Sequence, residues 1–307
     1  MKCFFVSILL LISVFLAAEE ESSPPPPIAS ADANFVLPED FSFFPISIEG
    51  GYLAMHRAGF RTNDVKGEHI RFTQAEASFG FILPLDLTWG LIFGAGWVNN
   101  EVNMSNNPQF TETNFGYATG SLGVFTRNDD WMWTVMFNIN IDTDELDLGN
   151  YALYDGILWG KYTLCPYLDF TFGFIVEVGL NKDKAWPIIG LSYEPCDKWK
   201  INSIYPTDIG VEYELFPCLT TTGAVRFLRS RHRVGPNEVN SRGIFQYQAV
   251  GTEFDLTYKP FEWFWIQGYL GHCFGGDFKV TNSADKHGIH YKFSGSLYGG
   301  GAAELKF

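Results

Sequence analysis

Apolar and polar side chains alternate along much of this chain with a period of two residues. The clearest run covers 168–181, and the runs 131–142 and 87–97 repeat its pattern. The apolar positions of the first run are Leu168, Phe170, Phe172, Phe174, Val176, Val178 and Leu180. Because successive side chains of a strand point to opposite faces, this period predicts strands with one apolar and one mostly polar face. No stretch from residue 43 onward has helical periodicity.

The pattern predicts fourteen antiparallel strands, of which the fourth, sixth, ninth and thirteenth alternate poorly, so twelve is the alternative. The predicted strands are 43–55, 69–83, 86–99, 113–127, 130–142, 151–164, 167–181, 186–194, 198–205, 208–215, 219–229, 243–258, 261–275 and 290–307. Every second connection is a short turn. Most of the others are longer and polar: 56–68, 100–112, 143–150, 182–185, 230–242 and 276–289. Short turns at one rim and long loops at the other are typical of a membrane-spanning β-barrel.

The first 42 residues carry two further signals. Lys2, the apolar stretch 4–16 and the small residues that follow it predict a signal peptide over 1–18. An uncleaved N-terminal anchor is the alternative, although the apolar stretch is shorter than the roughly 20 residues of a spanning helix. Residues 19–42 are acidic and rich in proline, and we expect a disordered leader there.

The last predicted strand ends on an aromatic residue, Phe307. Together with the signal peptide and the alternating loop lengths, this ending resembles bacterial outer-membrane β-barrel proteins, among them uncharacterised porin-like families. The resemblance implies an all-β, closed antiparallel transmembrane barrel over 43–307 in the outer membrane of a diderm bacterium, with its apolar face toward outer-membrane lipid. It also implies that the short turns are periplasmic and that the barrel-assembly machinery reads the C-terminal strand with Phe307.

The charge balance bears on the partners of such a barrel. Charged residues make up 18% of the chain, below the usual quarter, and the net charge is −14. An acidic protein of this kind disfavours nucleic acid and anionic surfaces and favours cations.

The polar strand phase supplies the candidate pore lining. Its acidic members include Glu76, Asp169, Glu177, Glu212, Glu214, Glu253 and Asp255, and Arg226 is among its basic counterparts. Fixed negative charge attracts cations and repels anions, so this face predicts a channel for passive diffusion of small polar solutes or cations. The other reading is a polar wall that conducts nothing.

Three cysteines lie at predicted short turns: Cys165, Cys196 and Cys218. In an oxidising compartment they could pair with each other, cross-link to other envelope proteins or remain free thiols. The alternative function is therefore a structural or adhesive envelope barrel with a closed lumen and disulfide cross-links. A homo-oligomer is also compatible with the sequence.

The sequence offers no catalytic constellation. It lacks nucleophile, metalloprotease, phosphate-loop and dinucleotide motifs, so we predict no enzyme and no cofactor. His287 and His290 are only a weak metal signal, and we predict no metal site; His56 and His232 are expected in loops. Aromatic residues near the short turns predict an interfacial girdle: Phe125, Trp131, Trp133, Tyr162, Tyr193, Trp199, Phe216, Tyr258, Phe261, Trp263 and Phe307.

Overall fold

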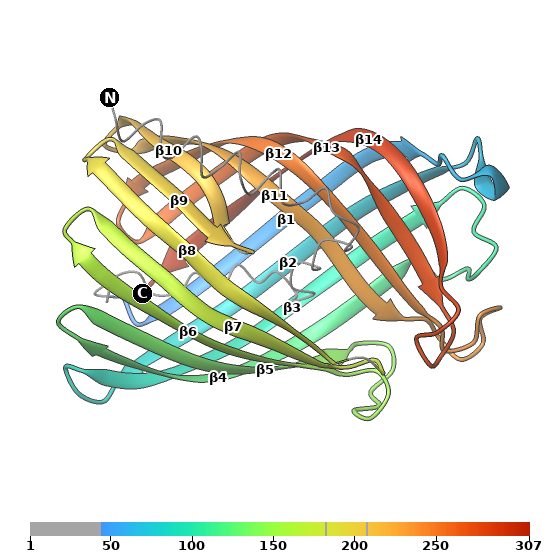
Figure 1. The fold of residues 1–307 in the computed structure, drawn as a ribbon, viewed down its shortest axis with the longest axis horizontal. Coiled ribbons are helices and arrows are strands. Elements are labelled where there is room, and N and C mark those ends of the chain that lie inside the picture. The colour runs from blue at the N-terminus through green and yellow to red at the C-terminus, as the bar shows by residue number, and fades with distance from the viewer. Residues whose placement is uncertain (1–43, 182, 207) are drawn as a thin grey trace.

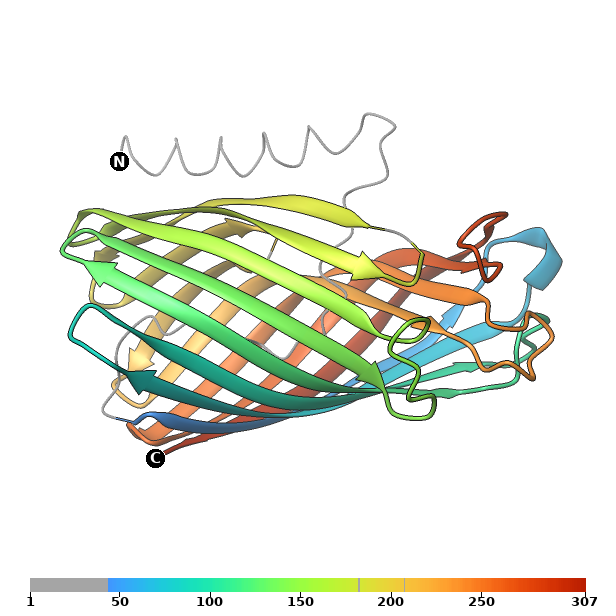
Figure 2. The same ribbon diagram turned by 90° about the horizontal axis from the view of Figure 1, so that it is seen from below.

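The chain forms a closed β-barrel with strongly tilted strands, seen in a computed structural model (Figures 1 and 2). The structure describes residues 44–181, 183–206 and 208–307. The predicted signal peptide and leader lie outside these residues. The strands are β1 (Ile46–Gly59), β2 (His69–Pro84), β3 (Trp89–Met104), β4 (Asn114–Asn128), β5 (Trp131–Asp142), β6 (Leu153–Cys165), β7 (Leu168–Gly179), β8 (Lys184–Cys196), β9 (Trp199–Tyr205), β10 (Asp208–Phe216), β11 (Leu219–Arg233), β12 (Ile244–Phe261), β13 (Phe264–Thr281) and β14 (Ile289–Lys306).

Each strand pairs with its two sequence neighbours, and β1 pairs with β14 to close the ring. The closing ladder runs from Ser47 opposite Lys306 to Met55 opposite Tyr298. Phe307 continues it, because its amide donates to the Ile46 carbonyl at 2.8 Å. Pairing of β1 with β14 removes the two terminal edges of the sheet, which is the condition for a sheet in lipid. The prediction of fourteen strands is confirmed, and the alternative of twelve is wrong.

The two rims differ as the sequence predicts. Short turns and the C-terminus share one end of the barrel, and the longer loops occupy the other (Figures 1 and 2). Several strands reach further toward the loop end than expected. β1 extends to Gly59 and β11 to Arg233, so His56 and His232 lie in strands, and their predicted placement in loops is wrong. A 3-10 turn, η2 (Asn63–Val65), lies in the β1–β2 loop.

The outer wall is apolar around the middle of the barrel. Large side chains such as Leu122, Phe137 and Leu270 are between 52% and 64% exposed. So much apolar surface exposed on the isolated chain is typical of a surface that contacts lipid or a partner protein. Among the described residues no helix is long and apolar enough to cross a membrane. The girdle prediction fails at Phe125, which is buried and packs over Gly90.

Candidate functional site

The barrel wall changes at the loop end because β9 and β10 are short. β10 pairs with β11 only as far as Ile209 opposite Val225, whereas β11 continues to Arg233 with β12 alone beside it. On the other side, the pairing of β8 with β9 starts at Ile189, opposite Tyr205. Within the described residues, the outer part of β11 therefore has no strand neighbour toward β8. It is free to leave the plane of the wall.

The outer part of β11 lies across the interior of the barrel. Tyr117 on β4 donates its hydroxyl proton to the Arg231 carbonyl at 3.2 Å, and Asn100 on β3 contacts the His232 ring nitrogen at 3.0 Å. Six strands separate β4 from β11 in either direction around the ring. Contact between strands on opposite sides requires that β11 crosses the lumen. We call residues 229–234 the β11 tip.

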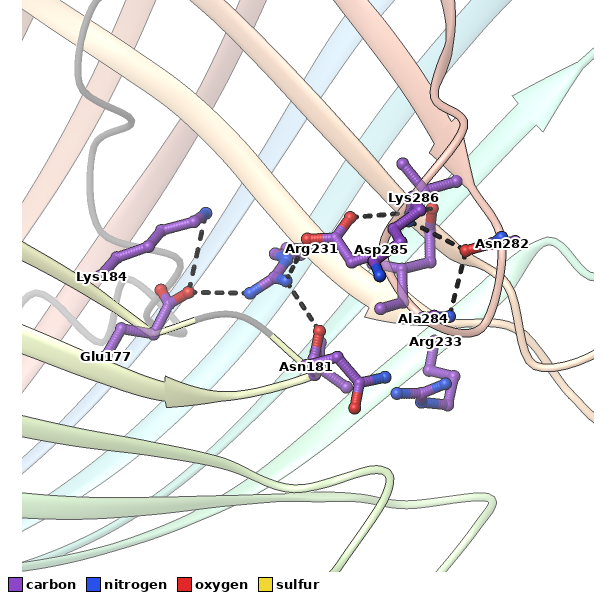
Figure 3. A network of polar contacts seen from close by, with 12 residues as sticks. Glu177, Asn181, Lys184, Arg231, Arg233, Asn282, Ala284, Asp285 and Lys286 are labelled. Atoms are coloured by element: carbon purple, nitrogen blue, oxygen red, sulfur yellow. Dashed lines mark hydrogen bonds and ion pairs between the residues drawn. The ribbon is translucent and has the colours of Figure 1, made fainter.

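An ion pair holds the β11 tip to the far wall (Figure 3). Arg231 is buried and donates to Glu177 on β7 at 3.1 Å and to Asp285 in the β13–β14 loop at 3.1 Å. Its guanidinium also donates to the Leu180 carbonyl at 2.9 Å. Lys184 adds a second cation 3.8 Å from Glu177. The hydrogen bonds from Arg231 to Glu177, Asp285 and the Leu180 carbonyl all come from a charged donor, and such charge-assisted hydrogen bonds are the strong ones.

The neighbouring arginines of the tip extend this attachment. Arg233 donates to the Asn150 carbonyl at 2.7 Å and to the Ser283 carbonyl at 3.1 Å. The Arg229 guanidinium lies 5.5 Å from the centre of the Trp186 ring on β8. Because alternate residues share a strand face, the three arginines lie on one face of the tip. Arg229 and Arg231 contact β8 and β7, whereas Arg233 contacts loops at the loop end.

The other face of the tip packs into aromatic side chains. His232 stacks on Tyr117 with centroids 4.6 Å apart, and Phe245 on β12 lies 4.4 Å from Phe115. Phe110, from the β3–β4 loop, stacks on Phe245 at 5.4 Å. All of these side chains are at most 2% exposed. The loop end of the barrel is thus closed by a packed cluster, the aromatic cluster, which continues through Phe72, Tyr247 and Phe293.

Loop carboxylates support the closed arrangement from outside. Glu112 accepts a hydrogen bond at 2.9 Å from the amide of Gly235, the residue that follows the tip. Glu238 accepts from the Thr111 amide at 2.7 Å. Burial raises the pKa of Glu112 above its ordinary value, while the Gly235 bond lowers it and nearby carboxylates, including Asp142, raise it further.

Below the tip, three adjacent strands carry buried acceptor oxygens without a hydrogen-bond donor. Asn138, Asp155 and Glu177 lie opposite one another on β5, β6 and β7, and one oxygen of each is unpartnered. Asn140 donates to the second oxygen of Asp155 at 2.6 Å. Asp155 and Glu177 are at most 1% exposed. Buried acceptors of this kind call for water, a proton or a cation.

A second charged group lies on the opposite wall. Arg226 on β11 donates to Glu253 on β12 at 2.5 Å and 3.0 Å, and Tyr298 donates to the other oxygen of Glu253 at 3.2 Å. Asp255 is 3% exposed and has one oxygen without a donor. The structure therefore pairs Arg226 with Glu253, and Asp255 lies two residues along β12 on the same strand face as Glu253.

The remaining predicted lining residues are spread around the wall. Glu76 accepts a hydrogen bond from Gln74 at 2.9 Å, and Asp169 forms an ion pair with Lys161 at 2.9 Å. Glu212 receives a long contact of 3.5 Å from Asn202, and Glu214 shares its strand face. These residues do not converge on one point, and their role in a pore stays a prediction.

The turn cysteines lie at one rim, as predicted. Cys165 and Cys196 end β6 and β8, and Cys218 precedes β11. Cys196 is exposed and the other two are half-buried, and within the described chain none is bonded to another cysteine. Their redox partners stay a prediction, as does the assembly role of Phe307, which is 55% exposed.

The two histidines of the β13–β14 region, His287 and His290, have different surroundings. His290 contacts Asp277 at 2.6 Å, while His287 adopts a left-handed backbone with φ of 56°. Among the described residues no group of three or more His, Cys, Asp or Glu side chains could hold a metal ion.

Sequence reasoning missed the β11 tip and the aromatic cluster. The strand was expected to end at 229, so Arg231 and His232 were assigned to a loop. A signal was present: the inward phase of β12 changes from Glu253 and Asp255 to Phe245 and Tyr247 toward the loop end. Aromatic residues on the polar phase indicate a packed interior at that level.

Comparison with known proteins finds relatives along most of the chain. An uncharacterised Chlamydia pneumoniae protein is 28% identical over 279 residues, covering 86% of this chain and 87% of its own length. Uncharacterised proteins of Chlamydia trachomatis and Chlamydia muridarum are each 29% identical over 281 residues, covering 85% of this chain and 87% of theirs. No family model matches the chain.

Solved structures of similar architecture are outer-membrane proteins. The COG4313 outer membrane channel of Pseudomonas putida F1 has a TM-score of 0.49 at 10% identity, covering 86% of this chain and 96% of that one. The Pseudomonas putida toluene transporter TodX has a TM-score of 0.35 at 8% identity, covering 85% and 89%. Because both TM-scores are below 0.5, we assign the fold from the strand pairing and not from these structures. The chain is a closed fourteen-stranded antiparallel barrel that resembles outer-membrane β-barrels.

Proposed function

We propose that this protein is an outer-membrane channel for passive diffusion of small polar solutes or cations, described here in a closed conformation. The apolar outer wall, the closed sheet and the shared rim of short turns and C-terminus support placement in the outer membrane with the short turns in the periplasm. No enzymatic activity and no cofactor are part of the proposal.

The observation that carries the proposal is the set of interior acceptor oxygens without donors. Asn138, Asp155, Glu177 and Asp255 each have one such oxygen, and all four point away from the lipid side of the wall. A permeating cation or a donor-bearing solute can supply the missing contacts. An anion cannot, which is why we expect cation preference.

Passage requires the β11 tip to move, because the tip and the aromatic cluster fill the loop end. The short β9–β10 hairpin supports such movement, since the tip has wall pairing on one side only. Breaking the contacts of Arg231 would let the tip return toward the wall.

Single-channel recording of the refolded protein in planar bilayers under a KCl gradient tests this function. We expect discrete openings with cation preference. Glu253→Gln leaves the charge of Arg226 unbalanced in the interior, so it should reduce that preference. Glu262→Gln, in the exposed β12–β13 turn, is the matched control and should leave it unchanged.

A correctly folded barrel that stays silent, even after Arg231 is replaced, would refute the channel. The second candidate, a structural barrel cross-linked through its turns, would then take its place. It is favoured by the packed loop end and by the common rim of Cys165, Cys196 and Cys218. It predicts a high-mass ladder on non-reducing gels of whole envelopes that disappears when Cys196 is replaced by serine.

A further inference from the structure

A hollow of about 350 Å³ opens on the outer face of the β4–β5 hairpin, beside the short-turn rim. Its lining is Thr126, Asn128, Trp131 and Trp133. Asn128 lies directly opposite Trp131, and Thr126 lies opposite Trp133. The four side chains thus form a square at the end of one hairpin, on the side of the wall that carries exposed Leu122 and Val124.

The indole rings lean away from β4, which leaves the hollow open. Trp131 and Trp133 are parallel with centroids 5.9 Å apart, and Trp131 contacts Tyr162 on β6 at 4.6 Å. Trp133 lies over Gly160, where an added Cβ would approach a ring carbon to 2.8 Å. Phe172 on β7 packs edge-on against Trp133 at 5.2 Å. The rings therefore form one aromatic wall over β6, beside the small side chains of β4.

The charges around the hollow are mainly negative. The turn between its two strands is Asp129 and Asp130, both exposed, and the neighbouring β2–β3 turn carries exposed Asp86. Arg127 is the adjacent base, on the opposite strand face from Thr126 and Asn128, and it has contacts of its own. Aromatic faces beside carboxylates attract an organic cation rather than a phosphate.

We propose that this hollow binds the ammonium head group of a zwitterionic phospholipid, with its acyl chains along the apolar wall above. The inference rests on the proposed membrane placement. A volume of about 350 Å³ holds a head group and glycerol but not a whole lipid, so the chains must lie outside it. Leu122, Val124 and Val135 are 40–55% exposed directly above and offer the surface for them.

Native mass spectrometry of the folded barrel in detergent tests the site with defined lipids. We expect dioleoyl-phosphatidylethanolamine to be retained over dioleoyl-phosphatidylglycerol by roughly 3- to 30-fold, the range of a cation–π contact. The double variant Trp131→Leu/Trp133→Leu should abolish that difference. Trp263→Leu removes an exposed tryptophan of the same rim and should keep it.

A second variant separates the two parts of the site. Asp129→Asn/Asp130→Asn should lessen the preference for the ammonium lipid while some binding remains, because the aromatic wall is intact. Heat-modifiable gel mobility confirms that each variant is folded.

Equal retention of both lipids by the wild type, or unchanged retention in the tryptophan variant, would mean adventitious annular lipid only and would overturn the proposal. So would a dimer mass lost in the tryptophan variant, since a second copy would then occupy the hollow. None of these readouts depends on conductance, so the channel function can fail separately.

Discussion

Replacing Arg231 with methionine removes the only cation that joins Glu177 to Asp285 in the described contacts. Both Arg231 and Glu177 have side chains at most 1% exposed. Deleting one partner of a buried pair typically costs about 3–5 kcal/mol, and because Lys184 still lies 3.8 Å from Glu177 we take the lower end of that range. If the tip is in equilibrium with a conformation in which Glu177 is hydrated, about 3 kcal/mol shifts the ratio of closed to open molecules by roughly a hundredfold.

Single-channel open probability in planar bilayers measures this shift, with the thermal transition of the folded barrel as a second readout. We expect a large rise in open probability for Arg231→Met. The double variant Glu177→Gln/Arg231→Met removes both charges of the buried pair and keeps Lys184 and Asp285 at its edge, so it should return toward the wild type. Arg61→Met, at an exposed loop arginine, is the matched control. If Arg231→Met opens no more often than Arg61→Met, or if the double variant stays open, the ion pair does not hold the tip and the reasoning is wrong.

Three further predictions concern other parts of the barrel. Phe110→Ala should destabilise the loop end by about 3–5 kcal/mol through loss of buried aromatic packing, seen as a lower unfolding temperature; an unchanged temperature would contradict it. Burial raises the pKa of Glu112, so its ionised form destabilises the fold above that pKa, and stability should increase as pH falls toward the ordinary glutamate range. Glu112→Gln should flatten that dependence in melts taken across pH, whereas an equally steep profile would exclude Glu112 as its source. Deleting Phe307 removes both hydrogen bonds to Ile46 and should lower the heat-modifiable fraction of exported protein; an equal fraction would argue against an assembly role.

The architecture could be predicted because a two-sided strand repeats one simple rule. Each strand that spans lipid needs an apolar outer face, so the phase of residues such as Phe170 and Phe174 is readable without any contact information. The phase also places Arg226 beside Glu253, since neighbouring inward positions of β11 and β12 can meet only on one face.

The β11 tip could not be predicted by the same rule. A strand inside the lumen has two buried faces, so Arg231 and His232 both interact although they point in opposite directions. The run of arginine and histidine at the end of β11 has the composition of an exposed loop. Only the pairing lengths of β9 and β10 show that the strand leaves the wall, and those lengths depend on tertiary register rather than on local pattern.

The two faces of the tip differ in how readily they can separate from their partners. Moving the aromatic face of His232 and Phe245 into water loses apolar burial, which has no replacement outside the cluster. Separating the arginine face costs less free energy, because water can solvate Arg231 and Glu177 once they part. A buried ion pair is only slightly more stable than its two hydrated charges. Opening should therefore begin with separation of the β11 tip from β7, and the tip should leave β4 only afterwards, as it returns toward the wall beside β12. This order favours a hinge at Val225, where pairing with β10 ends, over ejection of the whole β11–β12 end.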